Sequence, residues 1–138
     1  MAQVFVHDQL IRFSHCDPAG IVYYPRFFDL QHATMEDWFA RGVGLPLPRM
    51  IRERRIGVPT ATIQCDFRKP LRMGDLLRFE LRVRKAGNAS VQLDYSGTKD
   101  GVEHLRIAQT IVFMNLDTAT AVAIPEDLRP GIEQYLAP

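Results

Sequence analysis

The sequence predicts a single α+β domain in which one antiparallel sheet packs on one long helix. Two observations predict this class. A stretch of helical periodicity follows the first strand-like segment, and several segments in which apolar and polar side chains alternate follow the helix. The chain has 138 residues, enough for one domain with a substantial core and too few for two ordinary ones. We therefore treat residues 1–138 as one domain.

The first strand and the long helix come from the first third of the chain. Residues 4–14 are rich in Val, Ile and Phe and predict a strand, which the turn DPAG at residues 17–20 follows. Pro25 suits the first turn of a helix, where its missing N–H costs nothing. The segment RGVG ends this helix at about residue 41. Helical spacing predicts one stripe of side chains, made of Phe28, His32, Met35 and Phe39.

The rest of the chain reads mainly as strands. A short second helix is expected over residues 47–55, ended by Gly57. The segment KDGVE at residues 99–103 is a strong hairpin-turn signal. Pro125, followed by two acidic residues, looks like the start of a short C-terminal helix. Alternation predicts strands at ATIQCDF (61–67), LRFELRV (77–83) and VQLDY (91–95), and a longer strand at about 104–116. The predicted order is therefore β-α-β-β-β-β with a short helix at the end.

Composition narrows the class of protein. The hydrophobic content is 46% and the formal net charge is +1, so no overall charge would attract nucleic acid or a membrane surface. The two cysteines, Cys16 and Cys65, imply no disulfide framework, and the N-terminus lacks the pattern of a signal peptide. No apolar run approaches the ~20 residues that span a bilayer. We expect a cytoplasmic protein that binds no nucleic acid and inserts into no membrane.

Several catalytic motifs are absent from the sequence. It contains no G-x-S-x-G, no P-loop and no G-x-G-x-x-G, and its four histidines lack metal-ligand spacing. His15 and Cys16 are neighbours on an extended segment, so their side chains point to opposite faces and cannot form a nucleophile–base pair. The sequence therefore argues against a metal site and against a Ser or Cys hydrolase.

The segment HCDPAGIVYYPRFFDL, residues 15–30, places an acid shortly before a helix start. A helix N-terminus presents unpaired N–H groups and about half a positive charge, which can stabilise an oxyanion. If the DPAG turn folds the chain back, Asp17 and the first amides of the helix could face one carbonyl group, as acyl-transfer hydrolysis requires. From residue types alone, however, an Asp before Pro is more often a turn residue that bonds the nearby backbone.

Within this segment, CDPAGIVYYPRFF at residues 16–28 resembles the active-site signature of the 4-hydroxybenzoyl-CoA thioesterase family, which has the hotdog fold. The resemblance continues in GLP at 44–46, in the strand from Pro59 to Phe67 and in IP at 124–125. It implies a hotdog domain, in which an antiparallel sheet wraps around one long central helix. It also implies an acyl-CoA thioesterase that acts on a small aromatic acyl-CoA of the benzoyl or hydroxybenzoyl type.

The resemblance assigns roles to individual residues. Asp17 would be the catalytic carboxylate, either as nucleophile on the thioester carbonyl or as general base on water. The backbone N–H of Tyr24 would hold the thioester oxygen, and Gly20 would let the substrate approach the backbone closely. Coenzyme A is part of the substrate, and no separate cofactor or metal is implied. The sites would lie at the interface of a homodimer, and dimers would pair into tetramers. The implied acyl-binding residues are Tyr23, Pro25, Phe28, His32, Val58, Pro59 and Thr60.

Two positions and one segment depart from the family pattern and bear on the substrate. His32 stands where the best-known branch has a carboxylate on the buried face of the helix, and Val58 replaces a threonine. Two interpretations of His32 stay open: a core histidine with a satisfied partner, or a pocket group that binds the acyl moiety. KAGNAS at 85–90 replaces a basic triplet that clamps CoA phosphates. The candidate CoA-binding residues are therefore Arg68, Lys69, Arg72, Arg84, Lys85, Asn88 and Ser90.

Two other functions are compatible with the sequence. One is a thioesterase for short-chain aliphatic or phospholipid-linked acyl-CoA or acyl-carrier substrates. The other is a non-catalytic dimer that binds acyl-CoA without releasing free thiol.

Overall fold

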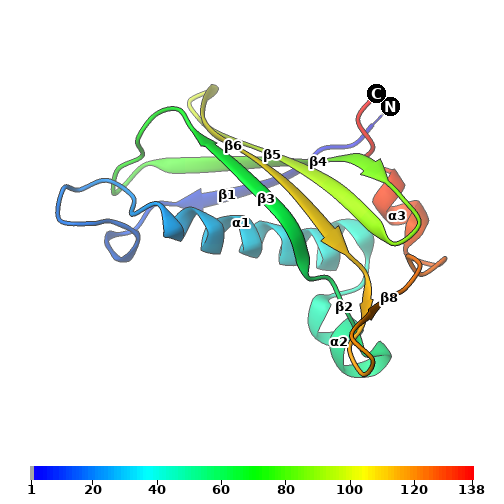
Figure 1. The fold of residues 1–138 in the computed structure, drawn as a ribbon. Helices are drawn as coiled ribbons and strands as arrows, with labels where there is room; N and C mark the ends of the chain where they lie inside the picture. Colours follow the sequence, from blue (N-terminus) through cyan, green and yellow to red (C-terminus); the bar gives the residue numbers. More distant parts are fainter. Residues whose placement is uncertain (1) are drawn as a thin grey trace.

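One long helix lies along the concave face of a curved sheet in the computed structural model, which describes residues 2–138 (Figure 1). The first half of the chain forms β1 (Phe5–Leu10), η1 (Phe13–His15), α1 (Pro25–Asp37), η2 (Trp38–Val43), α2 (Leu47–Arg54) and β2 (Ile56–Gly57). The second half forms β3 (Thr60–Phe67), β4 (Leu76–Ala86), β5 (Ser90–Lys99), β6 (Val102–Val112), β7 (Met114–Asn115), β8 (Thr120–Ala121) and α3 (Arg129–Glu133).

The central helix runs for 13 residues as α1 and continues for six residues as the π-helical η2. It starts at Pro25, as predicted, because the fixed φ of proline suits a first helical turn. It ends at Gly44, which has a left-handed φ of 102° and donates its N–H to the carbonyl of Phe39 at 2.9 Å. The helix therefore extends past the expected end near residue 41, and the wider π turn keeps Trp38 and Phe39 fully buried.

The main sheet has five strands in the order β1-β4-β5-β6-β3, and each neighbouring pair is antiparallel. The hairpin predicted at KDGVE joins β5 to β6. Asp100 and Gly101, with φ of 52° and 77°, form its two-residue loop between the paired residues Lys99 and Val102. Positive φ at both loop residues matches the twist of the flanking strands. The predicted order of the main elements and the antiparallel sheet are confirmed.

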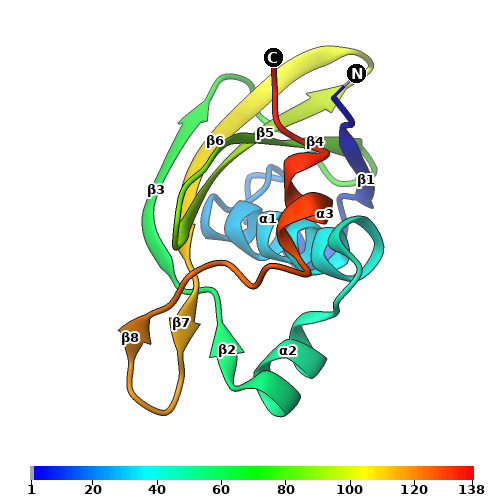
Figure 2. The same cartoon turned by 90° about the vertical axis from the view of Figure 1, so that its right-hand side faces the viewer.

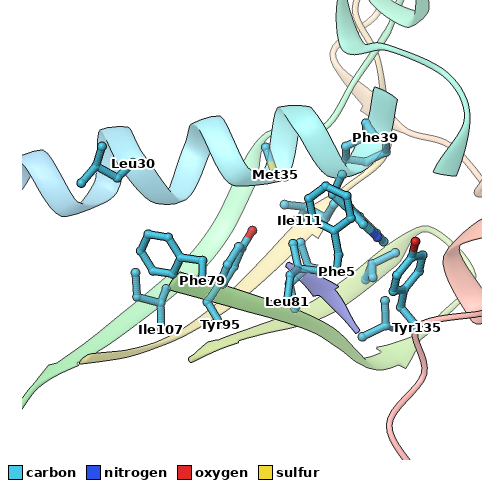
Figure 3. Packing of buried hydrophobic residues seen from close by; sticks show 14 of the residues in the cluster. Phe5, Leu30, Met35, Phe39, Phe79, Leu81, Tyr95, Ile107, Ile111 and Tyr135 are labelled. Carbon is cyan, nitrogen blue, oxygen red and sulfur yellow. The ribbon is translucent and has the colours of Figure 1, made fainter. Parts of the chain in front are cut away.

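The alternation along the central strands builds the core. Side chains on the concave face are buried and pack against the helix, and Figure 3 shows several of them beneath Leu30 and Met35 of α1. Burial of each large apolar side chain stabilises the fold by roughly 1.5–3 kcal/mol. The buried set comprises Leu77, Phe79, Leu81 and Val83 of β4, Val91, Leu93 and Tyr95 of β5, and Leu105, Ile107, Gln109 and Ile111 of β6.

The strand β3 differs from the others because it stays exposed at the edge of the sheet (Figure 2). All its side chains except Cys65 are exposed, including Ile63 at 41%. A register shift between Thr60 and Thr62 inserts one extra residue, so Thr60 lies opposite a buried residue of β6 and faces the concave side. The alternation predicted from Ala61 onward is therefore wrong at its first residue.

Several predicted boundaries also differ at the start of the chain. The first strand ends at Leu10, short of residue 14, because Phe13–His15 form a 3₁₀ turn. The backbone N–H of Arg12 donates to His15 Nδ1 at 2.9 Å and holds this turn. The short second helix ends before Gly57, because Arg55 already adopts a left-handed conformation with φ of 53°.

The C-terminal third carries elements that the alternation did not predict. A small sheet pairs β2, β7 and β8, and the long final strand breaks at Phe113 between β6 and β7. The last helix begins at Arg129 because residues 125–128 form a turn, so Pro125 does not start it. Within residues 2–138, no helix is both long and apolar enough to cross a bilayer.

Candidate active site

Residues 15–23 form a closed loop just before α1. Cys16 pairs with Val22 in an isolated antiparallel bridge, which closes the base of the loop. Gly20 adopts a φ of 80° at its tip, a left-handed conformation that favours glycine. The predicted DPAG turn is thus present, closed by the Gly20 N–H, which donates to the Asp17 carbonyl at 2.9 Å.

The carboxylate of Asp17 is only partly used inside this loop. Its Oδ1 accepts a hydrogen bond from the Ala19 N–H at 2.8 Å, the turn-forming bond that its residue type predicts. Its Oδ2 has no hydrogen-bond partner among residues 2–138. The half-buried side chain therefore keeps one oxygen available for a substrate or a water molecule.

Asp17 lines a hollow of about 340 Å³, which we call the carboxylate hollow. Phe13 from η1 and Met73 from the β3–β4 connection form its apolar wall, and both side chains are largely exposed. Sequence reasoning missed these two residues. The only feature of the sequence that could have indicated them is a large apolar side chain in a segment that shows no strand or helix periodicity.

The start of α1 presents one free amide. Pro25 has no N–H, and the N–H groups of Arg26 and Phe27 donate to the carbonyls of Tyr23 and Tyr24 at 2.9 and 3.1 Å. The N–H of Tyr24 has no acceptor in the described part of the chain. This amide stands at the positive end of the helix, where it can stabilise a developing negative charge.

Tyr24 lines a second hollow of about 290 Å³, which we call the aromatic hollow. The ring of Phe67 lies 6.2 Å from that of Tyr24 and 5.7 Å from that of Phe27. Arg68 and Lys69 line the same hollow. The arrangement can accept a flat apolar group beside two cationic side chains. Phe67 was not predicted as a site residue, although it ends the strand that carries the resemblance.

The two hollows adjoin each other. Gly20 lines the carboxylate hollow, and the next residue, Ile21, lines the aromatic hollow. Within one chain, Asp17 and Tyr24 therefore belong to neighbouring hollows separated by the tip of the loop.

The candidate CoA-binding residues fall into two groups. Arg68, Lys69 and Arg72 lie in or beside the β3–β4 connection, close to the loop, and residue 72 forms an isolated bridge with Ile21. Arg68 is held by an ion pair with Glu103 at 3.0 Å, whereas Lys69 and Arg72 form no ion pair with any described residue. The other group lies at the opposite end of the sheet (Figure 1). It comprises Arg84, Lys85, Asn88 and Ser90, which one chain does not bring to the hollows.

Within one chain, His32 is not buried in the core as the predicted stripe implies. Its side chain is 55% exposed, and its Nδ1 lies 3.1 Å from Glu36 Oε2 one turn further along the helix. Because successive helical residues turn by about 100°, His32 falls beside the buried face rather than on it. The interpretation as a core histidine therefore does not hold within one chain, whereas the interpretation as a pocket group that binds the acyl moiety stays a prediction. The face that α1 buries carries Phe27, Leu30, Gln31, Thr34 and Met35.

The remaining predicted acyl-binding residues lie in two separate places, near the start of α1 and at the start of β3. Tyr23 is exposed beside Tyr24, and Phe28 is half-buried. Val58 packs against the core, and the Pro59 carbonyl accepts from the N–H of residue 112 at 3.0 Å. Thr60, at the start of β3, accepts a hydrogen bond from a buried glutamine side chain at 2.8 Å.

Two titratable groups near the site are held in their neutral forms. Burial, with Arg12 and Arg26 nearby, lowers the pKa of His15, whose Nδ1 already accepts the Arg12 N–H. Burial, with Asp66 beside it, raises the pKa of the Cys65 thiol to about 11, so this thiol is not a nucleophile at neutral pH.

A family match covers most of the chain, from residue 11 to residue 132, and its model describes the thioesterase-like superfamily. The chain belongs to this superfamily. The prediction of an acyl-CoA thioesterase is thereby confirmed at the level of the class.

Individual relatives agree with this assignment. The 1,4-dihydroxy-2-naphthoyl-CoA hydrolase of Thermosynechococcus vestitus is 29% identical over 123 residues, which are 88% of this chain and 84% of that hydrolase. A thioesterase-superfamily structure from Jannaschia sp. CCS1 has a TM-score of 0.90 at 24% identity and covers 98% of this chain and 94% of its own. A gentisyl-coenzyme A thioesterase structure has a TM-score of 0.82 at 24% identity, and the match covers 90% of this chain and 98% of that structure. The predicted hotdog fold is confirmed.

Proposed function

We propose that this thioesterase hydrolyses a small aromatic acyl-CoA, of the benzoyl or hydroxybenzoyl type, to the free acid and CoA. The observation that carries the proposal is a free carboxylate oxygen, Asp17 Oδ2, and a free helix-start amide, that of Tyr24, lining neighbouring hollows before α1. The aromatic wall around Phe67 supports an aromatic acyl group. The names of two relatives point the same way, since one acts on a dihydroxynaphthoyl ester and the other on a gentisyl ester.

Asp17 provides the reacting carboxylate by one of two routes. In the first, Oδ2 attacks the thioester carbon, the C–S bond breaks to release CoA, and water then hydrolyses the mixed anhydride. In the second, the carboxylate removes a proton from water, which attacks the thioester carbon directly. Both routes consume one water and place negative charge on the carbonyl oxygen, which the Tyr24 N–H and the helix N-terminus stabilise.

We propose further that the working unit is a dimer joined through β3. An eight-residue strand with an open edge and exposed apolar residues, Ile63 and Phe67, readily pairs with another strand. Antiparallel pairing of two copies places the start of one β3 beside the end of the other. The pairing of dimers into tetramers, implied by the family resemblance, stays a prediction.

This dimer would also unite the two groups of CoA-binding candidates. The β4–β5 turn, with Asn88 and Ser90, lies at the same end of the sheet as the start of β3, because residue 90 pairs with residue 112 next to it. Antiparallel pairing brings that end of the second copy toward Lys69 and Arg72 of the first. We therefore place the CoA phosphates between these two ends.

The decisive test is Asp17→Asn, assayed by free-thiol release from benzoyl, hydroxybenzoyl, phenylacetyl and short aliphatic CoA esters. We expect a folded protein whose kcat falls at least about 1,000-fold, since no other group supplies the carboxylate. Asp66→Asn, which changes an exposed carboxylate on the outer side of β3, is the matched control and should keep full activity.

Three outcomes would contradict the proposal. Undiminished turnover by Asp17→Asn removes Asp17 from the mechanism. A preference for aliphatic over aryl esters favours the short-chain alternative. Binding of acyl-CoA by the unchanged protein without thiol release favours the non-catalytic one.

A further inference from the structure

A chain of four polar side chains runs from the centre of α1 to the start of β3. Gln31 Nε2 and the Tyr95 hydroxyl both donate to Gln109 Oε1, at 3.0 and 2.7 Å. Gln109 Nε2 then donates to Thr60 Oγ1 at 2.8 Å. Gln31, Tyr95 and Gln109 are 2%, 0% and 3% exposed, whereas Thr60 is exposed. Figure 3 shows the Tyr95 hydroxyl pointing from β5 toward α1.

Packing alone does not account for this chain. Gln109 occupies an inward position of β6 between Ile107 and Ile111, where alternation calls for an apolar residue. Replacing buried, mutually bonded polar groups by apolar ones of similar shape is often neutral or stabilising. A buried polar network that stands where an apolar core would serve, and that ends on an exposed hydroxyl, indicates a function at that hydroxyl.

The Tyr95 hydroxyl and the Gln31 amide together set the direction of the hydrogen bonds. Burial raises the pKa of Tyr95, so its hydroxyl keeps its proton and donates it to Gln109 Oε1. Turning the Gln109 amide around would set its N–H groups against the donor of Gln31 and leave the Tyr95 proton without this acceptor. Gln109 therefore presents its N–H to Thr60.

The consequence appears at the end of the chain. Because Thr60 Oγ1 accepts the Gln109 N–H, its own proton points elsewhere, and it has no acceptor among residues 2–138. Thr60 lies on the concave side of β3, the same side as Phe67. The exposed start of β3 thus carries a hydrogen-bond donor with a set orientation.

In the proposed dimer this donor reaches the substrate site. If the two copies of β3 pair antiparallel about their midpoints, residue 60 of the second copy lies beside Phe67 of the first, next to the aromatic hollow. The two-fold relation keeps both concave sides on one face of the joined sheet, so the Thr60 hydroxyl opens toward the acyl group.

We propose that Thr60 donates a hydrogen bond to an oxygen substituent of the acyl group, and that Gln31, Tyr95 and Gln109 are positioning residues for it. This inference rests on the proposed function and names its substrate class: aryl-CoA esters with a ring oxygen, such as hydroxybenzoyl esters, rather than the unsubstituted parent. A site built to bond a substrate oxygen discriminates strongly against an analogue without it.

The test compares kcat/KM for 2-, 3- and 4-hydroxybenzoyl-CoA with kcat/KM for benzoyl-CoA. We expect the unchanged enzyme to prefer at least one hydroxylated ester, and Thr60→Val to lower that preference about tenfold, the effect of one lost hydrogen bond. Thr60→Ser, which keeps the hydroxyl, should retain the preference. Tyr95→Phe, which removes the orienting proton, should lower the same ratio; because it also removes a buried hydrogen bond and lowers the melting temperature, the ratio is measured well below that temperature.

The matched control is Thr62→Val, two residues along β3 and on its outer side, which should leave the ratio and the activity unchanged. A Thr60→Val ratio within about twofold of the unchanged enzyme for every isomer overturns the inference, as does the absence of any preference at the start. Failure of the proposed function is seen separately, as thiol release that survives Asp17→Asn.

Discussion

Asp75 fixes the connection between β3 and β4, which forms one wall of the candidate site. Its Oδ2 accepts the Arg72 N–H at 2.8 Å, and its Oδ1 lies 2.9 Å from Lys99 Nζ. Burial acts to raise the pKa of this carboxyl, but the bonds from Arg72 and Lys99 outweigh burial, and the pKa lies below its ordinary value. The charged form of Asp75 therefore stabilises the folded connection.

We expect Asp75→Asn to lower the free energy of unfolding by about 1 kcal/mol at pH 7. A carboxyl whose pKa is lowered by folding contributes stability above its unfolded pKa, and that contribution is lost as pH falls through the lower folded value. The difference between Asp75→Asn and the unchanged protein should hold from pH 7 to about 5 and shrink below about pH 4. Urea unfolding of both proteins at pH 7 and 3.5 measures this difference in the free energy of unfolding. An undiminished difference at pH 3.5 would show that the charge of Asp75 is not its cause.

Single side chains differ in how far the sequence predicts their position. Side chains of a strand point to one face or the other in turn, so only two assignments are possible. The inward positions of Phe79 and Leu81 therefore follow from alternation alone. The buried face of a helix can be centred on many positions, and α1 carries apolar residues at two adjacent ones, Phe27 and Phe28. The sequence therefore fits a stripe through Phe28 as well as one through Phe27, and the structure, which buries Phe27, leaves His32 exposed within one chain. Asp17, by contrast, lies in a turn that its local sequence defines.

At the scale of elements, the C-terminal helix α3 packs closely against η2, the end of the central helix. A Cβ at Gly131 would lie 2.8 Å from the carbonyl oxygen of Val43 in η2 and 3.2 Å from its Cα. The nearby ring of Tyr135 packs edge-on against Trp38 at 5.8 Å. The absence of a side chain at residue 131 thus lets two helical backbones approach closely.

We expect Gly131→Ala to lower the free energy of unfolding by about 1–3 kcal/mol, because the added methyl meets backbone that cannot rotate away. Intrinsic helix propensity alone predicts the opposite sign, a gain of about 1 kcal/mol. Urea or thermal unfolding distinguishes the two effects, with Gln134→Ala, an exposed position just after the same helix, as control. A stabilised Gly131→Ala protein would show that α3 does not need this contact.

Long elements were predictable from the sequence, and short or irregular ones were not. The strands β4 to β6 and the helix α1 extend over enough residues to show a period, and KDGVE carries its own turn chemistry. The two-residue strands β2, β7 and β8 are too short to show one. The π turn of η2 and the bulge at residue 61 depend on packing against other elements. These features appear only when the chain is folded.

At the scale of the whole molecule, one chain holds only part of the proposed site. The loop with Asp17, the amide of Tyr24 and the aromatic hollow lie together at one end. Thr60 and the β4–β5 turn lie at the other end of the sheet. The local sequence could predict the first group because it forms a single motif. It could not predict the polar chain behind Thr60, which joins residues as distant as Gln31 and Gln109.

The last prediction tests whether two copies complete the site. We expect the protein to sediment as a dimer or a larger assembly of dimers, with a melting temperature that rises with protein concentration. Ile63→Lys places a charge on the exposed concave side of β3 and should weaken dimerisation at least about tenfold. Gln64→Lys, on the outer side of the same strand, is the matched control.

The activity of Ile63→Lys at different protein concentrations then tests whether the dimer is needed for turnover. Ile63→Lys leaves Asp17 and Tyr24 in place, so a site contained in one chain would keep its turnover in the dissociated protein. A shared site instead predicts that the specific activity of Ile63→Lys falls on dilution and recovers as concentration restores the dimer, because the contacts from the start of β3 come from the second copy. Full turnover by a monomer at nanomolar concentration would show that the second copy contributes nothing to the chemistry.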